Sequence, residues 1–195
     1  MRAAPLDAES IMSATEEVLR RHGPEKATVL DVARLLGVSH GSVYRHFPSK
    51  AALREAVIRR WLDQVEELAA ASRDEGAAPP ERLRSLLLSM FAAKWAKARE
   101  DPELFATFRA LAAEYSTVCS AHTAFVLEQI RDVVQEGMDR GDFTAAEPEA
   151  SALAVLDATC HFHDPVYAEK WRATPDLEAR AERVVSLLLE GLRAR

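Results

Sequence analysis

Hydrophobic residues recur every three or four positions along most of the chain, and glycine or proline interrupts this pattern at intervals. Apolar residues between Ile11 and Leu19 share one face of a helix predicted over residues 7–22, which Gly23 and Pro24 end. Strict alternation of apolar and polar residues, the pattern of a half-buried strand, does not recur. The sequence therefore predicts an all-α protein with about nine helices.

The next segment has the signals of two short helices joined by a tight turn. Thr28 is placed to cap the first of them, and Asp31 completes a capping box with aspartate in place of glutamate. Gly37 suits a left-handed turn, Ser39 is placed to cap the following helix, and Pro48 ends it. We therefore expect a helix-turn-helix, the element that places its second helix in a DNA groove.

The same periodicity predicts the remaining helices. Ser49 is placed to cap a fourth helix that begins at Lys50 and continues to about residue 71, and residues 72–80 form a linker. Further helices are expected from Glu81, from Asp101-Pro102, from Ser116 to near Gly137, from Pro148, and from Asp176 to near Arg193, with residues 165–175 irregular or a single turn. This divides the chain into a helix-turn-helix domain over residues 1–60 and a helical domain over residues 61–195.

The charge differs in sign between these two parts, although the whole chain has a formal net charge of −6. Residues 1–60 contain ten Lys or Arg and seven Asp or Glu, a net charge of +3, whereas residues 61–195 have a net charge of −9. A basic N-terminal part and an acidic remainder suit a protein that binds nucleic acid with one end only.

Nothing in the composition indicates secretion or a membrane. The N-terminal segment lacks an apolar signal core, and no apolar run is long enough to span a bilayer. Cys119 and Cys160 lie inside predicted helices and do not suggest a disulfide framework. We therefore expect a cytoplasmic protein.

With Val43 and Phe47 turned inward, the third helix exposes small, hydrogen-bonding and cationic side chains. These residues are Ser39, His40, Gly41, Ser42, Tyr44, Arg45 and His46. No acidic residue occurs from residue 35 to residue 54, so this helix can approach phosphates without repulsion. Gly41 and Ser42 keep its leading edge thin enough to enter a major groove. The pattern predicts a DNA-binding surface.

This segment also matches the pattern of a known family. The matching residues are Thr28, Asp31-Val32-Ala33, Leu36-Gly37-Val38-Ser39, Gly41-Ser42-Val43-Tyr44-Arg45-His46-Phe47, Pro48-Ser49-Lys50 and Leu53. Over about the first 60 residues the chain resembles the TetR family of bacterial helix-turn-helix transcriptional regulators. Beyond these residues the chain resembles the family only in its helical architecture, because the ligand domains of this family diverge widely in sequence.

The resemblance implies roles for single residues. Thr28, Tyr44 and Lys50 look like phosphate contacts, and His46 is expected to touch the DNA backbone. The expected groove-facing residues are Ser39, His40, Gly41, Ser42 and Arg45. His40 departs from the family, in which Lys, Arg or Pro is common at this place, so the operator sequence cannot be borrowed from a relative.

The resemblance further implies a homodimeric repressor that binds a palindromic double-stranded DNA operator and is released by a small, largely apolar ligand, with no cofactor. The last helix has an apolar arc too wide to be covered by one layer of its own chain. We expect one side of it to meet a second copy. The expected interface residues are Leu153, Val184, Val185, Leu188, Leu189 and Leu192.

A ligand pocket is expected between the helices of residues 61–195. Its aromatic candidates are Phe91, Trp95, Phe105, Phe108, Tyr115 and Phe125, and its polar candidates are His122, Gln129, Asp157, Cys160 and His161. The same aromatic residues also suit an ordinary hydrophobic core.

Two other functions remain open at this point. One is a helical small-molecule or metal sensor without operator binding, and the other is a metal-dependent enzyme that uses His161, His163 and Asp164. However, His161 and His163 are two positions apart on a helix and point in different directions. No nucleophile elbow, P-loop, dinucleotide-binding turn or HExxH motif is present. We therefore predict no catalytic residue and no metal site.

Overall fold

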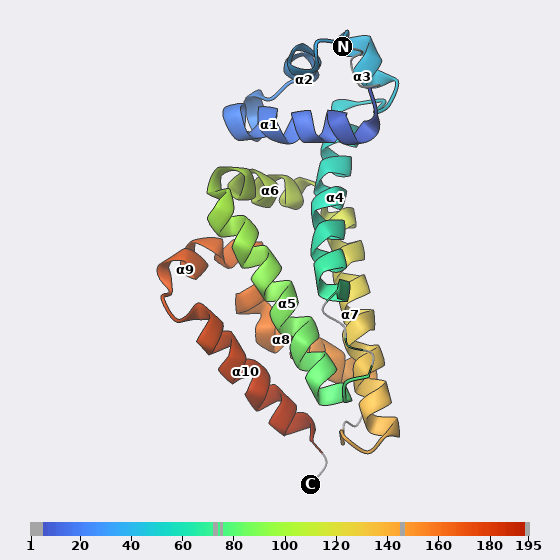
Figure 1. The fold of residues 1–195 in the computed structure, drawn as a ribbon, viewed down its shortest axis with the longest axis vertical. Helices are drawn as coiled ribbons and strands as arrows, with labels where there is room; N and C mark the ends of the chain where they lie inside the picture. The colour runs from blue at the N-terminus through green and yellow to red at the C-terminus, as the bar shows by residue number, and fades with distance from the viewer. Residues whose placement is uncertain (1–5, 72–73, 75, 145–146, 194–195) are drawn as a thin grey trace. The chain divides into compact units, whose positions relative to one another are not determined.

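The computed structural model describes residues 6–71, 74, 76–144 and 147–193. These residues form helices and no strand (Figure 1), which confirms the all-α prediction. The helices are α1 (Ala8–Lys26), α2 (Val29–Leu36), α3 (His40–Tyr44), α4 (Lys50–Ala71), α5 (Pro79–Glu100), α6 (Pro102–Glu114), α7 (Ser116–Asp139), α8 (Pro148–His163), the 3-10 turn η1 (Pro165–Tyr167), α9 (Ala168–Ala173) and α10 (Leu177–Leu192). The segment expected to be irregular or a single turn therefore contains η1 and the short helix α9.

The chain divides into two compact units. Unit 1 contains the residues up to Leu62 together with Asp101–Cys119, and unit 2 contains Asp63–Glu100 and the residues from Ser120 onward. The sequence placed a boundary near residue 60, close to Leu62, but it did not place α6 with the N-terminal helices. Helix α6 packs against α1, and Arg20 Nε donates to Asp101 Oδ2 at 2.6 Å. This contact joins residues 81 positions apart in the sequence. The periodicity of apolar residues predicts single helices and cannot predict such a contact between them.

Unit 1 has its own aromatic core. The Trp61 ring of α4 stacks on Phe108 at a centroid distance of 5.4 Å and meets Phe105 edge-on at 5.7 Å. The N-terminal helices therefore share a core with α6.

Helix α1 is interrupted at Gly23, which has φ 72 and ψ 172. This is the place where the sequence predicted that the helix would end.

Unit 2 is built around α5, α8 and α10, which pack on one another. The inner face of α10 has a buried residue at every fourth position, as expected for an amphipathic helix. These residues are Leu177, Ala181, Val185 and Leu189. Ion pairs from α5 to α10, Arg84 with Glu182 and Arg99 with Glu178, lie beside this apolar contact.

The loop after α7 holds the end of α10. The Thr144 amide donates to the Leu192 carbonyl at 2.8 Å, and the Thr144 hydroxyl donates to the Arg193 carbonyl at 3.1 Å. Phe143 is buried directly over Gly137, where any β-carbon would overlap its ring. Glycine at position 137 is therefore required by close packing.

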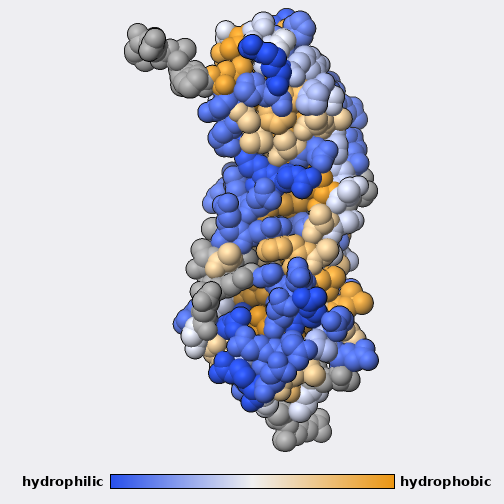
Figure 2. Space-filling view, turned by 90° about the vertical axis from the view of Figure 1, so that its right-hand side faces the viewer, coloured by the Kyte–Doolittle hydropathy of each residue, from blue (hydrophilic) through white to orange (hydrophobic). Residues whose placement is uncertain are grey.

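Hydrophilic side chains predominate on the face shown in Figure 2, with smaller hydrophobic areas between them. This agrees with a composition in which 29% of the residues are charged. No helix in the described parts of the chain is long and apolar enough to cross a membrane.

Candidate nucleic-acid interface and ligand sites

The helix-turn-helix is formed by local hydrogen bonds that the sequence predicted. Thr28 Oγ1 accepts from the Asp31 amide at 3.2 Å, and an Asp31 carboxylate oxygen accepts from the Thr28 amide at 3.2 Å. The Thr28 hydroxyl donates to the same carboxylate at 2.5 Å, which lowers the pKa of Asp31. Gly37 ends α2 in the left-handed region, with φ 67 and ψ 28. The predicted capping box and turn are confirmed.

Helix α3 follows the turn and is short. Ser39 caps it by accepting from the Ser42 amide at 3.2 Å, and the Ser39 and Ser42 hydroxyl oxygens lie 2.9 Å apart. Val43 is fully buried. Phe47 is half-buried, and its amide donates to the Val43 carbonyl at 3.0 Å. The apolar side of α3 is thus anchored in unit 1, and its opposite side is turned outward.

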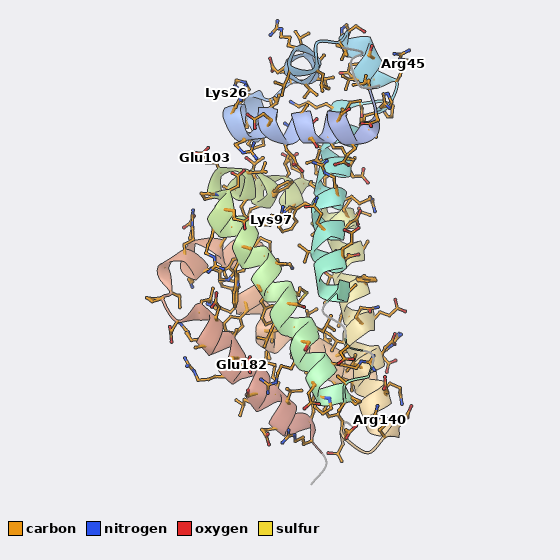
Figure 3. The ribbon with its side chains drawn as sticks, viewed as in Figure 1. Lys26, Arg45, Lys97, Glu103, Arg140 and Glu182 are labelled. Carbon is orange, nitrogen blue, oxygen red and sulfur yellow. The ribbon has the colours of Figure 1, made fainter. Side chains whose placement is uncertain are left out.

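The outward side of α3 contains the predicted groove-facing residues. The exposed residues are Ser39, His40, Gly41, Tyr44, Arg45 and His46, and Ser42 is half-buried. The Tyr44 ring lies edge-on to His40 at 6.1 Å, and Arg45 projects from the surface (Figure 3). Because residues 35–54 include no carboxylate side chain, nothing on this segment repels a phosphate.

The two predicted phosphate contacts at helix starts differ in their surroundings. Lys50 begins α4 and is half-buried, and burial, followed by the neighbouring Arg54, lowers its pKa. An anion bound at Lys50 would offset this shift. Thr28 is exposed, but its hydroxyl and amide are already bonded to Asp31. A phosphate bound at Thr28 would therefore have to compete with the Asp31 carboxylate for these two donors.

The interior of unit 2 contains a buried histidine. His122 on α7 is 9% exposed, and its Nδ1 lies 2.7 Å from Glu66 Oε1. Burial, followed by the charge of Lys94, lowers the pKa of His122 to about 4, so the ring is neutral near neutral pH. Burial also raises the pKa of Glu66. His122 Nε2 is buried and has no hydrogen-bond partner among the described residues.

A small cavity of about 10 Å³ lies beside this histidine, with room for about one water molecule. Its lining residues are Val65, Glu66, Leu86, Met90, His122, Phe125, Val126 and Gln129. The structure thus brings together three of the predicted ligand residues, His122, Phe125 and Gln129.

The other aromatic candidates do not gather around one pocket. Phe105 and Phe108 pack in the core of unit 1. Phe91 and Trp95 pack with Phe162 in the core of unit 2, at centroid distances of 5.8 Å and 6.4 Å from it. This corrects the expectation of a single aromatic pocket, because the six rings fall into two different units.

Three further residues predicted to bind a ligand lie away from this small cavity beside His122, which we call the His122 cavity. Tyr115 belongs to unit 1, where it forms the C-cap of α6. Asp157 is exposed on α8. Cys160 is half-buried, and burial, followed by the carboxylate of Asp164, raises the pKa of its thiol. None of the three lines that cavity.

His161 and His163 have different neighbours. The His161 ring lies 4.8 Å from the Tyr167 ring, whereas His163 Nε2 lies 3.1 Å from the Leu156 carbonyl oxygen. Within the described ranges, no group of three or more His, Cys, Asp or Glu side chains is placed to hold a metal ion. The geometry gives no support to the metal-using alternatives.

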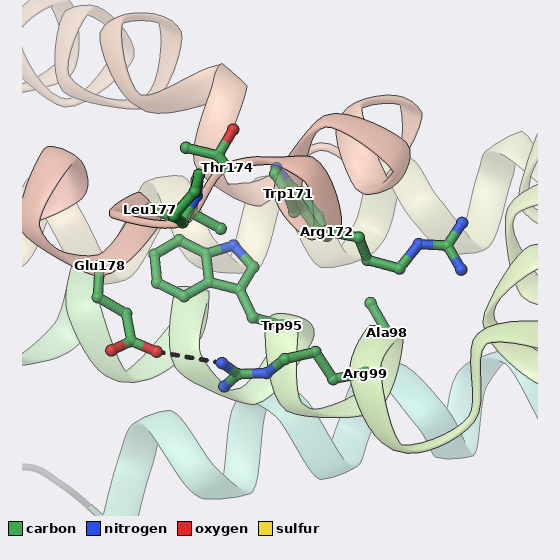
Figure 4. A pocket seen from close by; sticks show the side chains of 9 residues that line it. Trp95, Ala98, Arg99, Trp171, Arg172, Thr174, Leu177 and Glu178 are labelled. Carbon is green, nitrogen blue, oxygen red and sulfur yellow. Dashed lines mark hydrogen bonds and ion pairs between the residues drawn. The ribbon is translucent and has the colours of Figure 1, made fainter.

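Unit 2 also contains a larger cavity that the sequence did not indicate, with a volume of about 310 Å³ (Figure 4). We call it the α5–α9–α10 groove, and its lining residues are Trp95, Ala98, Arg99, Trp171, Arg172, Thr174, Pro175, Leu177 and Glu178. Of these, only Trp95 was predicted to contact a ligand. The others were missed because α9 interrupts the helical pattern and meets α5 only through folding.

The apolar arc of α10 divides into two sides. Val185 and Leu189 are 0% and 3% exposed, so their own chain covers them. This corrects the prediction that they meet a partner. Leu153 on α8 and Leu187 on α10 are 50% and 74% exposed. The half-buried members of the predicted set are Val184, Leu188 and Leu192.

An N-terminal helix-turn-helix followed by a second helical unit is typical of helix-turn-helix regulators. The family models agree with this class. Residues 11–57 match the model for bacterial regulatory proteins of the tetR family, and residues 79–185 match the model for a tetracyclin repressor-like C-terminal domain. The chain therefore belongs to the TetR family, which confirms the resemblance found in its sequence.

Individual relatives match the chain over only part of its length. The HTH-type transcriptional regulator TtgR of Pseudomonas putida is 35% identical over 82 residues, which cover 42% of this chain and 39% of that protein. The match thus spans about two fifths of the relative's length.

Solved structures share the fold over nearly the whole chain. A TetR transcription regulator from Haloarcula marismortui has a TM-score of 0.75 at 22% identity, covering 96% of this chain and 98% of that one. SmeT, the repressor of the Stenotrophomonas maltophilia multidrug efflux pump SmeDEF, has a TM-score of 0.74 at 19% identity, covering 97% and 91%. At these identities the likeness is one of fold alone.

Proposed function

We propose that this protein is a DNA-binding transcriptional regulator, acting as a repressor, and that α3 enters the major groove of its operator. The observation that carries the proposal is the capped α2–α3 turn, which presents an exposed, acid-free helix anchored by Val43. Groove contacts come from the side chains on the outer face of α3, with Arg45 the strongest candidate for reading a guanine. Tyr44 and Lys50 hold the DNA backbone.

The regulator binds a palindromic operator as a homodimer. Support comes from α8 and α10, which pack on each other. Leu153 on α8 and Leu187 on α10 are exposed, and Val184 and Leu188 on α10 are half-buried. Apolar side chains of this kind on neighbouring helices suit burial against a second copy. A two-fold dimer then presents two α3 helices to half-sites about one helical turn apart.

A small ligand binding in unit 2 releases the operator. The best-supported contact is His122, because the carboxylate of Glu66 faces Nδ1 and favours the tautomer with the proton there. Nε2 is then left as an acceptor, which suits a largely apolar ligand with one hydroxyl or N–H group. Half-exposed Phe125 would have to move to enlarge the cavity. Release requires that the ligand prefer the conformation that cannot bind DNA.

A gel-shift experiment on the DNA upstream of the protein's own gene tests the DNA-binding proposal. We expect a sequence-specific shift that Arg45→Ala weakens by about 1–3 kcal/mol, mainly at one base pair. Equal losses of affinity for operator and random DNA would mean that Arg45 contacts the DNA backbone and not a base. The absence of any shift at low salt would overturn the proposal.

A further inference from the structure

The α5–α9–α10 groove has an apolar floor. Trp95, Trp171 and Leu177 line it, and each is more than nine-tenths buried. The Trp95 Nε1–H donates to the Phe162 carbonyl at 3.0 Å, and the Trp171 Nε1–H donates to the His161 carbonyl at 2.6 Å. Because both indole N–H groups are bonded inside the unit, the tryptophans offer ring carbons to whatever enters the groove.

The rim of the groove is charged. Arg99 Nη1 lies 3.3 Å from Glu178 Oε1, and these side chains are 61% and 71% exposed. Figure 4 shows the Arg99 guanidinium beside the Trp95 ring, reaching toward Glu178. Arg172 is exposed at the rim and forms no ion pair with any described residue. Two cations and one carboxylate give the rim a net positive charge.

We propose that this groove binds aromatic monocarboxylates, at a site separate from the His122 cavity. Its volume of about 310 Å³ lies at the small end of the range of ligand pockets, roughly 300–1,000 Å³. The ligand's ring packs on Trp95 and Leu177, as aromatic rings do against an indole. Its carboxylate pairs with Arg99, whose planar guanidinium holds a carboxylate through two parallel hydrogen bonds.

Glu178 acts as the ligand's competitor. In the free protein the Glu178 carboxylate forms an ion pair with Arg99, but an ion pair as exposed as this one is weak. A carboxylate that is also held by the tryptophan floor has an added apolar contact that Glu178 lacks. Binding therefore exchanges one carboxylate for another at Arg99, and Arg172 supplies a second cation that attracts the anion to the groove.

Calorimetric titration of the full chain with naphthoate tests the proposal. We expect binding with a dissociation constant below about 1 mM, and much weaker binding of neutral naphthamide and of non-aromatic cyclohexanecarboxylate. Arg99→Gln is expected to weaken naphthoate binding about tenfold or more, because a bidentate contact is lost. Glu178→Gln should tighten it, because the competing carboxylate is gone. The matched control Arg131→Gln, at an exposed ion pair on α7, should leave it unchanged.

The opposite shifts of Arg99→Gln and Glu178→Gln separate a binding role from a loss of folding, which would weaken binding in both variants. Equal affinity for naphthoate and naphthamide would overturn the proposal, and so would undetectable naphthoate binding by the wild-type chain at about 10 mM. Unchanged binding by Arg99→Gln would also overturn it, because the ligand would then lie elsewhere. None of these readouts involves DNA, so the outcome is independent of the proposed regulatory function.

Discussion

The helix-turn-helix and unit 2 are held together by contacts of different range. In the first, hydrogen bonds join residues three positions apart, as between Thr28 and Asp31. In unit 2, Trp95 donates to a carbonyl 67 positions away, and Arg84 pairs with Glu182 at a separation of 98 positions. Residue types close together in the sequence therefore specify the first region, whereas the second depends on which helices meet.

The same difference separates the functions that we propose for the two regions. The outer side of α3 is fixed within unit 1 by the Ser39 cap and by buried Val43. The cavities of unit 2 lie between helices and depend on how those helices pack. This contrast suits the proposed ligand-released regulator, in which the DNA-binding surface keeps its shape and the packing of unit 2 changes when a ligand binds.

The largest effect on stability is expected in the core of unit 2. Phe91 is fully buried, so Phe91→Ala removes a whole ring and should lower the free energy of unfolding by about 3–5 kcal/mol. The control is Phe125→Ala, where the side chain is 37% exposed, with an expected loss of about 1 kcal/mol or less. Urea unfolding measures both. Similar losses in the two variants would mean that Phe91 does not belong to a packed core.

Acidification should act on unit 2 through His122. Its pKa is lowered from 6.5 to about 4 in the folded chain, so the unfolded chain binds more protons between these values. Stability should therefore fall as the pH decreases through this window, by up to about 3 kcal/mol. The raised pKa of Glu66 acts in the opposite direction. Comparison of the wild type with His122→Gln by urea unfolding isolates the histidine. An identical pH dependence in both proteins would contradict the buried neutral ring.

Two glycines of unit 2 give a sharper test of close packing. A β-carbon at Gly137 would overlap the Phe143 ring, whereas one at Gly191 in α10 would meet nothing within 4 Å. Gly137→Ala should therefore destabilise the protein by about 1–3 kcal/mol. Gly191→Ala should be neutral or stabilise it by up to about 1 kcal/mol, since alanine favours a helix. Thermal unfolding of both variants decides this, and a harmless Gly137→Ala would refute the packing of Phe143 on α7.

The smallest stability effect is expected in the helix-turn-helix. Thr28→Ala removes the hydroxyl that caps α2 and should cost about 1 kcal/mol, whereas Thr28→Ser keeps the hydroxyl and should lose little. Urea unfolding compares the two variants. Equal losses would mean that the methyl group of Thr28, and not its hydrogen bond, stabilises this end of the helix.

These contrasts explain what could be predicted from the sequence. Thr28, Gly37 and Ser39 were placed correctly because caps and left-handed turns depend on residue type at fixed spacing. Phe105 and Val185 were assigned to a pocket and to an interface, although they are buried within their own units. Periodicity identifies the apolar face of a helix but cannot say which helix covers it.

We propose that the α3 side of unit 1 binds the DNA backbone and grooves. The salt dependence of operator affinity tests this proposal when it is measured for the wild type, for Lys50→Ala and for the control Lys97→Ala on α5. If Lys50 contacts a phosphate, Lys50→Ala should weaken binding to all sequences and reduce the slope of log affinity against log salt by about 1, with no change for Lys97→Ala. The same slope for all three proteins, or no DNA binding by the wild type at low salt, would contradict this claim.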